Sequence, residues 1–232
     1  MTYFQFLFLF LVPVLLFLIV ANTLNSRIGL RELTGLFILV IIAILYTTPW
    51  DAYLINENIW YYDNSKVLMQ LFNIPIEEYI FMLMQTLSGC LICCLIDDSS
   101  NKSLLRFQLK YVYLFLLLFL FGWFLIYIDS FKYLGLIITW GSLPLGIQWS
   151  LGSHIILKNY KKYLLPFALI TFYLWIADSI AIRDGIWTLS ENTICRIKLY
   201  NLPIEEMIFF LITNLLVFQG MLLWKNIEFK ND

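Results

Sequence analysis

The sequence predicts an all-α integral membrane protein with about seven transmembrane helices, built from two parallel three-helix repeats and a linking helix. Of its 232 residues, 61% are hydrophobic and 13% are charged, whereas charged residues make up about a quarter of a typical soluble domain. Several apolar runs reach the roughly 17–25 residues with which a helix crosses a bilayer. We expect the membrane spans at residues 3–20, 33–48, 76–96, 110–128, 133–151, 163–180 and 204–224.

The repeat is predicted from a motif that occurs twice. The pattern Asn-x-Pro-Ile-Glu-Glu stands at residues 73–78 and again at residues 201–206, each time directly before a predicted span. Each copy ends one of the two long links of the chain, at residues 49–75 and 181–203. An aspartate and a tryptophan nine residues apart precede each copy, as Asp51 with Trp60 and as Asp178 with Trp187.

These matched spacings divide the chain into two halves. We expect a first repeat at residues 1–98, a linking helix within residues 99–130 and a second repeat at residues 131–232. Equivalent spans are then four spans apart, so both halves enter the membrane in the same direction. The two motif copies therefore lie on the same side of the membrane and at similar depth.

The glutamate pairs of the two motifs are the candidate catalytic residues. A charged side chain at this depth is costly unless it is paired, protonated or faces a cavity, and such residues are functional candidates. Since acidic groups that share one buried cavity do not all ionise together, at least one is expected to hold a proton and to serve as a general acid. The candidates, with the two repeated aspartates, are Glu77, Glu78, Glu205, Glu206, Asp51 and Asp178.

Other motif residues are predicted to shape this site. Pro75 and Pro203 are expected in the first turn of their helices, where a missing N–H costs nothing, with Asn73 and Asn201 as caps. Consecutive helical residues differ by about 100°, so one glutamate of each pair faces the interior. The recurring Trp60 and Trp187 offer ring faces to a developing cation. Against this stands the simpler interpretation, in which the glutamates only begin helices and the tryptophans form an interfacial belt.

Basic residues predict the orientation, because lysine and arginine concentrate on the cytoplasmic side. Ten of them follow the odd-numbered spans and five follow the even-numbered spans. The larger group is Arg27, Arg31, Lys102, Arg106, Lys110, Lys158, Lys161, Lys162, Lys225 and Lys230. We therefore expect a multi-pass protein of the inner (plasma) membrane, with its N-terminus outside and its C-terminus in the cytoplasm.

No cofactor, metal or nucleic acid is predicted as a ligand. The chain has 15 basic and 16 acidic residues, and this balance argues against a nucleic-acid partner. It lacks a dinucleotide fingerprint and a phosphate-binding loop. Cys90, Cys93 and Cys94 lie inside an apolar span, where buried cysteine is a small apolar residue. The single histidine, His154, lies in a link.

The doubled Pro-x-Glu-Glu, together with Trp50-Asp51 and Gly185-Ile186-Trp187, resembles the membrane-integral lycopene cyclase domain family in its fused two-repeat form. The second half departs from the first, because Ala177-Asp178 stands where the first has Trp50-Asp51. The resemblance covers nearly the whole chain. It leaves open whether both repeats are catalytic.

The resemblance implies an enzyme, an intramolecular lyase that closes the linear ends of lycopene into beta rings. The products would be gamma- and then beta-carotene, in a redox-neutral reaction that a proton starts. It implies lycopene from the bilayer as substrate, membrane lipid around the chain, and contact with other carotenoid-pathway enzymes. Trp60, Trp187, Pro75 and Pro203 would line the substrate site. Which glutamate donates the proton is left open.

Other functions remain as alternatives. A proton-coupled transporter or channel would also use membrane carboxylates and parallel repeats. A cyclase of C50 carotenoids is the alternative within the same family. A retinal-binding protein is excluded, because it needs a lysine in the middle of the last span and residues 204–224 contain none.

Overall fold

The computed structural model describes residues 1–96 and 102–228, and within them the chain is a bundle of helices. Six helical segments of this described part are long and apolar enough to cross a membrane. They are Tyr3–Leu24, Leu30–Asn56, Ile76–Ile96, Leu109–Ile126, Asp129–Arg183 and Ile204–Asn226. The chain is therefore an all-α, multi-pass membrane protein. The predicted boundary between residues 98 and 99 and the basic residue Lys230 lie outside the described residues.

The first span is a helix with a local change of winding. It comprises α1 (Tyr3–Phe6), a π-helical turn η1 (Leu7–Leu11) and α2 (Val12–Leu24). Pro13 lies two residues after the π turn and has no backbone N–H to donate. Such turns commonly absorb a missing bond in an otherwise continuous helix. The segment thereby reaches the end of the bundle where Tyr3 is fully buried.

The second predicted span, at residues 33–48, is longer in the structure. Helix α3 (Leu30–Asn56) continues through Pro49 and past the predicted end at residue 48. Asp51 is therefore inside a helix and not in a link, and it is 1% exposed. Helices α4 (Ile76–Ile96), α5 (Leu109–Ile126) and α7 (Ile204–Asn226) agree with their predicted spans within a few residues.

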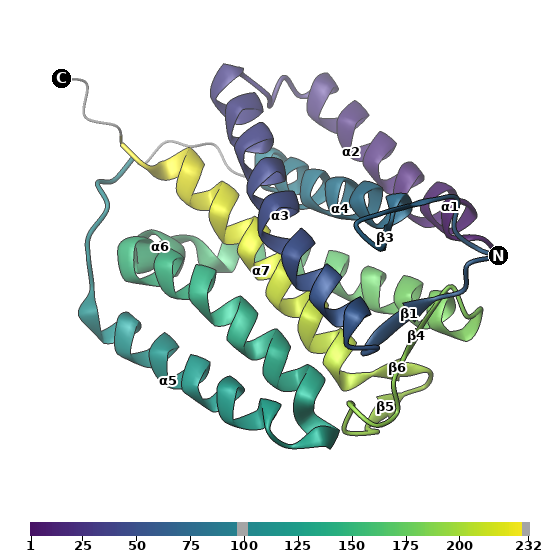
Figure 1. Cartoon of the computed structure of the whole chain (residues 1–232). Helices are drawn as coiled ribbons and strands as arrows, with labels where there is room; N and C mark the ends of the chain where they lie inside the picture. Colours follow the sequence, from purple (N-terminus) through teal and green to yellow (C-terminus); the bar gives the residue numbers. More distant parts are fainter. Residues whose placement is uncertain (97–101, 229–232) are drawn as a thin grey trace.

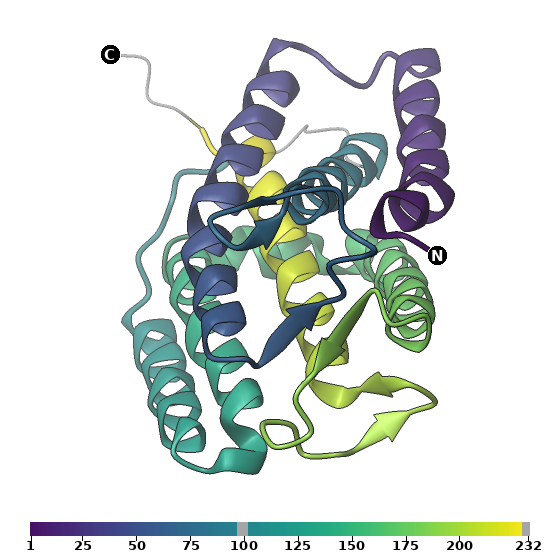
Figure 2. The same ribbon diagram turned by 45° about the vertical axis from the view of Figure 1, so that its right-hand side comes forward.

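The predicted fifth and sixth spans belong to one continuous helix. After a 3-10 turn η2 (Asp129–Phe131), helix α6 (Lys132–Arg183) runs for 52 residues. A straight helix of that length measures about 78 Å, yet both ends of α6 lie at the same end of the bundle. Tyr133 N donates to Thr193 O (3.0 Å) near one end, and Trp187 Nε1 donates to Asp178 Oδ1 (2.9 Å) near the other. Figures 1 and 2 show α6 turning back on itself.

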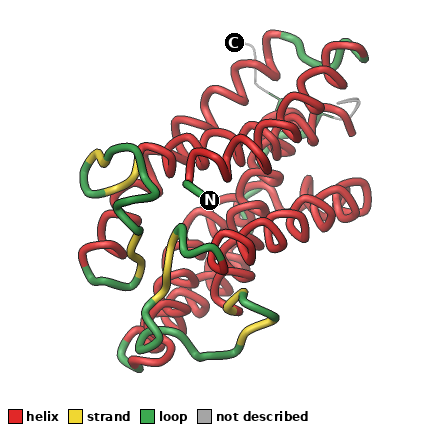
Figure 3. Tube along the Cα trace, turned by 90° about the vertical axis from the view of Figure 1, so that its right-hand side faces the viewer, coloured by secondary structure: helices red, strands yellow, loops and turns green. Residues whose placement is uncertain are grey.

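The long links contain short strands that the sequence analysis did not predict. In the described residues, β1 (Trp60–Tyr62) pairs antiparallel with β4 (Trp187–Leu189). Within each link a small hairpin forms, β2 (Gln70–Leu71) with β3 (Ile74–Pro75) and β5 (Lys198–Leu199) with β6 (Leu202–Pro203). Figure 3 shows these segments at one end of the bundle. The β1–β4 pair joins the first link to the second.

The predicted helix caps were wrong. Pro75 and Pro203 end strands β3 and β6, and α4 and α7 begin one residue later. Asn73 turns the β2–β3 hairpin with a φ of 65°, beside Phe72 at 55°. Two-residue hairpin turns require this left-handed backbone, and asparagine tolerates it. The motif therefore encodes a hairpin that delivers the glutamates to the helix start.

Close helix packing fixes α5 against α6. A Cβ atom on Gly135 would lie 2.7 Å from Gly122 O and 2.7 Å from Ile126 N, both backbone atoms. Small residues at such crossings let membrane helices approach closely. Away from this contact, α5 exposes large apolar side chains such as Leu117 and Phe124, as expected for a helix that faces lipid.

Candidate active site

One glutamate from each motif copy lines the same small cavity. This cavity lies at the end of the bundle that carries the strands, where α4 and α7 begin. Glu78 and Glu206 both face it, and they are 8% and 2% exposed. Its other lining residues come from both repeats: Tyr3, Trp60, Tyr62, Phe81, Asp178, Trp187, Phe209 and Phe210. Three acids and a wall of aromatic rings thus share one enclosed space.

Tyrosine hydroxyls hold the two cavity glutamates. Tyr3 Oη donates to Glu78 Oε2 (2.6 Å), and Tyr62 Oη donates to the same oxygen (2.9 Å). Tyr133 Oη donates to Glu206 Oε1 (2.7 Å). Burial and the nearby Glu78 carboxyl raise the pKa of the Tyr62 phenol well above its usual range. Tyr62 therefore keeps its proton at neutral pH and acts as a donor.

Tyr3, Tyr62 and Tyr133 were not among the predicted site residues. Tyr3 and Tyr133 are 1% and 0% exposed and occupy equivalent places near the start of the first and fifth predicted spans. A signal for them existed. Tyr3 lies 48 residues before Asp51 and Tyr133 lies 45 residues before Asp178, so an alignment of the two halves with a gap of three residues pairs them.

The repeated aspartates lie beside the cavity glutamates but differ in their contacts. Asp178 lines the cavity and accepts a hydrogen bond from Trp187 Nε1, at the spacing that the sequence suggested. Asp51 is equally buried, yet neither of its carboxyl oxygens accepts a hydrogen bond from the described residues. Glu78 and Glu206 are the electrostatic neighbours of both aspartates. The four acids therefore form one electrostatic group.

The other glutamate of each pair fastens a loop. Glu77 Oε1 accepts the backbone N–H of Leu68 (2.8 Å), and Glu205 Oε1 accepts that of Cys195 (2.7 Å). Both side chains are fully buried, but neither lines the cavity. Pro75 and Pro203 are also buried away from the cavity lining. The structure thus separates the ten predicted site residues into a cavity set and a supporting set.

Aromatic rings pack closely around the cavity. The ring of Trp187 lies 5.0 Å from that of Tyr3 and 5.3 Å from that of Phe6, between centroids. The ring of Trp60 lies 5.8 Å from those of Tyr133 and Phe209. Such rings attract a positive charge by about 2 kcal/mol or more in a dry site.

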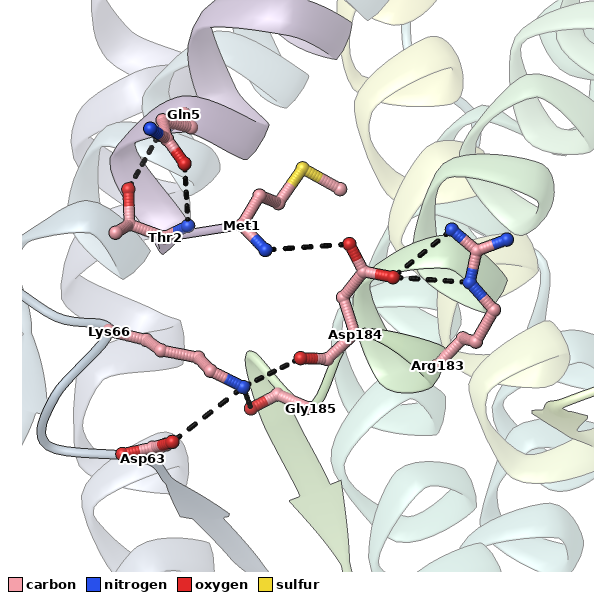
Figure 4. A network of polar contacts seen from close by, with 8 residues as sticks. All are labelled: Met1, Thr2, Gln5, Asp63, Lys66, Arg183, Asp184 and Gly185. Carbon is pink, nitrogen blue, oxygen red and sulfur yellow. Dashed lines mark hydrogen bonds and ion pairs between the residues drawn. The ribbon is translucent and has the colours of Figure 1, made fainter.

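Polar contacts above the cavity join the loops of the two halves (Figure 4). Lys66 Nζ donates to the carbonyl oxygens of Asp184 (2.6 Å) and Gly185 (3.0 Å), and it forms an ion pair with Asp63 at 3.6 Å. The carbonyl of Lys66 accepts the backbone N–H of Tyr3 (2.9 Å). The hydrogen bonds from the Arg183 side chain lower the pKa of the half-buried Asp184. Lys66 thus links three segments whose side chains line or border the cavity.

Fold and site together define a multi-pass membrane protein whose buried carboxylic acids face an aromatic cavity. The sequence profile of the lycopene cyclase family matches residues 1–96 and 131–222. The chain therefore belongs to this family. The match omits the segment that contains α5. No solved structure matches the chain.

Curated relatives agree with the family. The lycopene beta-cyclase of Halobacterium salinarum is 36% identical over 193 residues, which cover 82% of this chain and 81% of that protein. The bifunctional lycopene cyclase/phytoene synthase of Leptosphaeria maculans is 35% identical over 205 residues. That of Arthroderma gypseum is 34% identical over 232 residues. The matched regions span 35% and 39% of these two fungal proteins.

Proposed function

We propose that this chain is a lycopene beta-cyclase, which closes the linear ends of lycopene to give gamma- and then beta-carotene. The observation that carries the proposal is the shared cavity, to which each repeat contributes one buried glutamate and one tryptophan. Ring closure needs an acid, a base, a dry pocket and stabilisation of a cation. Carboxylic acids and aromatic rings in an enclosed membrane cavity supply these four elements.

The proposed reaction transfers one proton in and one proton out. The acid adds its proton to the terminal double bond, and the neighbouring double bond attacks the resulting tertiary cation to close the ring. The base then removes a proton to leave the ring double bond, so the product is an isomer of the substrate. Two phenol hydroxyls donate to Glu78 and one to Glu206, and such donors favour the anionic form. We therefore assign the base to Glu78 and the acid to Glu206.

The assignment requires a return of the proton between turnovers. After one ring closure the proton is on Glu78, and Glu206 has lost its own. Because both side chains line the same cavity, the proton returns across it, with Asp51 and Asp178 as the neighbouring acids. The ring faces of Trp60 and Trp187 stabilise the carbocation that exists after protonation and before the base removes a proton. Glu77, Glu205, Pro75 and Pro203 position the loops and take no part in proton transfer.

We further propose seven crossings arranged as two parallel repeats, with residues 1–98 and 131–232 joined by a linking helix within 99–130. In this arrangement the bent helix α6 crosses twice. Matched hydrogen bonds support the repeat: Ile76 N donates to Met69 O and Ile204 N to Ile197 O, each at 3.0 Å. Tyr46 Oη donates to Trp140 O, and its counterpart Tyr173 donates to Phe10 O.

Lysine and arginine are more numerous in the links after the odd-numbered spans, and this excess supports an orientation with the C-terminus in the cytoplasm. We place the protein in the inner (plasma) membrane. The cavity glutamates then lie toward the outer side. Lycopene and lipid are the partners within the membrane. The names of the fungal relatives, in which a lycopene cyclase is joined to a phytoene synthase, support contact with other carotenoid-pathway enzymes.

Expression in cells that accumulate lycopene tests the proposed function. We expect the pigments to include gamma- and beta-carotene in cells with the chain, and lycopene alone in cells with an empty vector. Chromatography with absorption spectra distinguishes the three compounds. If lycopene stays unchanged while the protein is present in the membrane fraction, the proposed activity is wrong. Cells that make C50 carotenoids test the alternative substrate in the same way.

A further inference from the structure

A large apolar cavity adjoins the small one, and we call it the first-repeat cavity because α3 and α4 of the first repeat form one side of it. Its volume is about 530 Å³, within the range of ligand pockets. Glu78, Phe81 and Phe209 line both cavities, so the large cavity leads to the acids. The remaining wall comes from α3, α4, the first half of α6 and α7. It includes Ile42, Ala43, Thr47, Met82, Gln85 and Ile147.

This cavity opens sideways, where the helices face lipid. Ile42 on α3 and Ile147 on α6 line it, and they are 54% and 62% exposed. In a membrane-spanning segment, exposed apolar side chains contact acyl chains. Within the wall, Gln85 Nε2 is occupied by Thr213 Oγ1 (2.9 Å) and Asn214 Oδ1 (3.1 Å). An apolar molecule dissolved in the bilayer therefore reaches the cavity without crossing water.

The equivalent groove, which we call the second-repeat groove, lies where the second half of α6 meets α2 and α4, and its lining contains no acid. Val14, Phe17, Leu169 and Ile170 line this groove with other residues, but none of the three acids that line the small cavity does. On its inner side lies a very small cavity bordered by Phe10 and other side chains. The two halves therefore share an architecture and differ in access to the site.

Three pairs of equivalent residues account for this difference. Where the first repeat has Ala43, Thr47 and Met82, the second has larger side chains at the corresponding positions, 127 or 128 residues later. These are Ile170, Leu174 and Phe210, which are 8%, 3% and 3% exposed. The added side-chain volume fills the path that is open in the first repeat, because interiors are close-packed.

We infer that the linear substrate enters only through the first-repeat cavity, where its polyene lies between α3, α4, α6 and α7 and its end group passes Glu78 into the aromatic cavity. This inference rests on the proposed function. Since there is one entrance, the two ends of one molecule react in turn. The one-ring product must leave, reverse and enter again, so it is released into the bilayer between the two closures.

Transplanting the second-repeat residues into the first repeat tests this inference. We expect the double variant Ala43→Ile with Thr47→Leu to fall at least about tenfold in the formation of both gamma- and beta-carotene, because the larger side chains close the cavity. The measurement is pigment composition in lycopene-accumulating cells, normalised to membrane protein. The control Leu45→Trp lies on the same helix and is 70% exposed outside the cavity lining; it is expected to keep wild-type conversion.

A second pair of variants keeps the test decisive if the double variant fails to accumulate. Ile42→Trp narrows the mouth of the first-repeat cavity, and Leu169→Trp makes the equivalent change in the second-repeat groove. Both positions are more than half exposed, which lets the larger ring fit without repacking the core. We expect Ile42→Trp to reduce conversion at least about fivefold and Leu169→Trp to leave it unchanged.

The outcomes separate this inference from the proposed function. If wild type converts lycopene, and Ile42→Trp and the double variant do so equally well at equal protein level, the single entrance is wrong and the cyclase stands. Equal losses in Ile42→Trp and Leu169→Trp also overturn the single entrance. If wild type makes no cyclic product, the proposed function itself fails.

Discussion

At the scale of residues, adjacent glutamates of identical sequence context do different work because a helix turns by about 100° between them. Glu78 and Glu206 face the aromatic cavity, whereas Glu77 and Glu205 face loop backbone. This division predicts different effects of the same substitution. We expect Glu78→Gln and Glu206→Gln each to lower cyclisation by about 10²–10⁴-fold, the usual contribution of general acid–base catalysis.

The neighbouring glutamates provide the matched control. In Glu77→Gln and Glu205→Gln the amide oxygen still accepts the hydrogen bond of the loop N–H, so we expect most of the activity to remain and the stability to fall by about 1 kcal/mol. Pigment analysis and detergent melting curves measure the two effects. A loss in Glu77→Gln as large as in Glu78→Gln, at equal protein level, contradicts this division of roles.

From the sequence alone, the predicted site residues are those that occur in both halves at matched spacing. The doubled motif and the Asp–Trp spacing identified Glu78, Glu206, Asp178, Trp60 and Trp187, all of which line the cavity. Tyr3 and Tyr133 were missed because a tyrosine near a span end is normally explained as an interfacial anchor. Local patterns did not show which glutamate of each pair points inward, because that depends on the exact residue at which the helix begins.

At the scale of elements, hydropathy located the spans but not how they are connected. Pro144 and Pro166 lie inside α6, and neither ends it. Proline kinks a membrane helix more often than it terminates one, because neighbouring groups satisfy the freed carbonyls. The stretch between the predicted fifth and sixth spans, residues 152–162, contains several lysines, and for this reason a link is predicted there. In the structure these residues are part of helix α6. The hairpins β2–β3 and β5–β6 were missed because two-residue strands carry no periodic signal.

The close crossing of α5 and α6 predicts that a larger side chain at Gly135 destabilises the protein. Gly135→Val places side-chain atoms against Gly122 O and Ile126 N, which are backbone atoms that cannot move aside easily. We expect a loss of stability of about 1–3 kcal/mol, as for other overpacked sites, seen as a lower melting temperature in detergent. Gly220→Ala is the control, since its closest neighbour is the flexible end of the Leu39 side chain. An equal melting temperature for Gly135→Val and wild type contradicts the close crossing.

At the scale of the whole molecule, the cavity exists only where the two halves meet. Glu78 and Trp60 come from the first repeat, and Glu206, Asp178 and Trp187 from the second. The β1–β4 pair, the contacts of Lys66 with Asp184 and Gly185, and the packing of α4 against α7 hold the halves together. Each half contributes only one glutamate to the cavity lining.

This dependence predicts the behaviour of a chain divided between residues 98 and 99. Residues 1–98 or residues 99–232 expressed alone should form no cyclic carotenoid, because each lacks one cavity glutamate. Expressed together in lycopene-accumulating cells, the two pieces should restore at least about a tenth of the wild-type conversion, since apolar helices reassociate in the membrane through packing and interhelical hydrogen bonds. Co-purification through a tag on one piece shows the assembly directly. Cyclisation by a single piece would place the complete site within one repeat and refute a cavity shared between the halves.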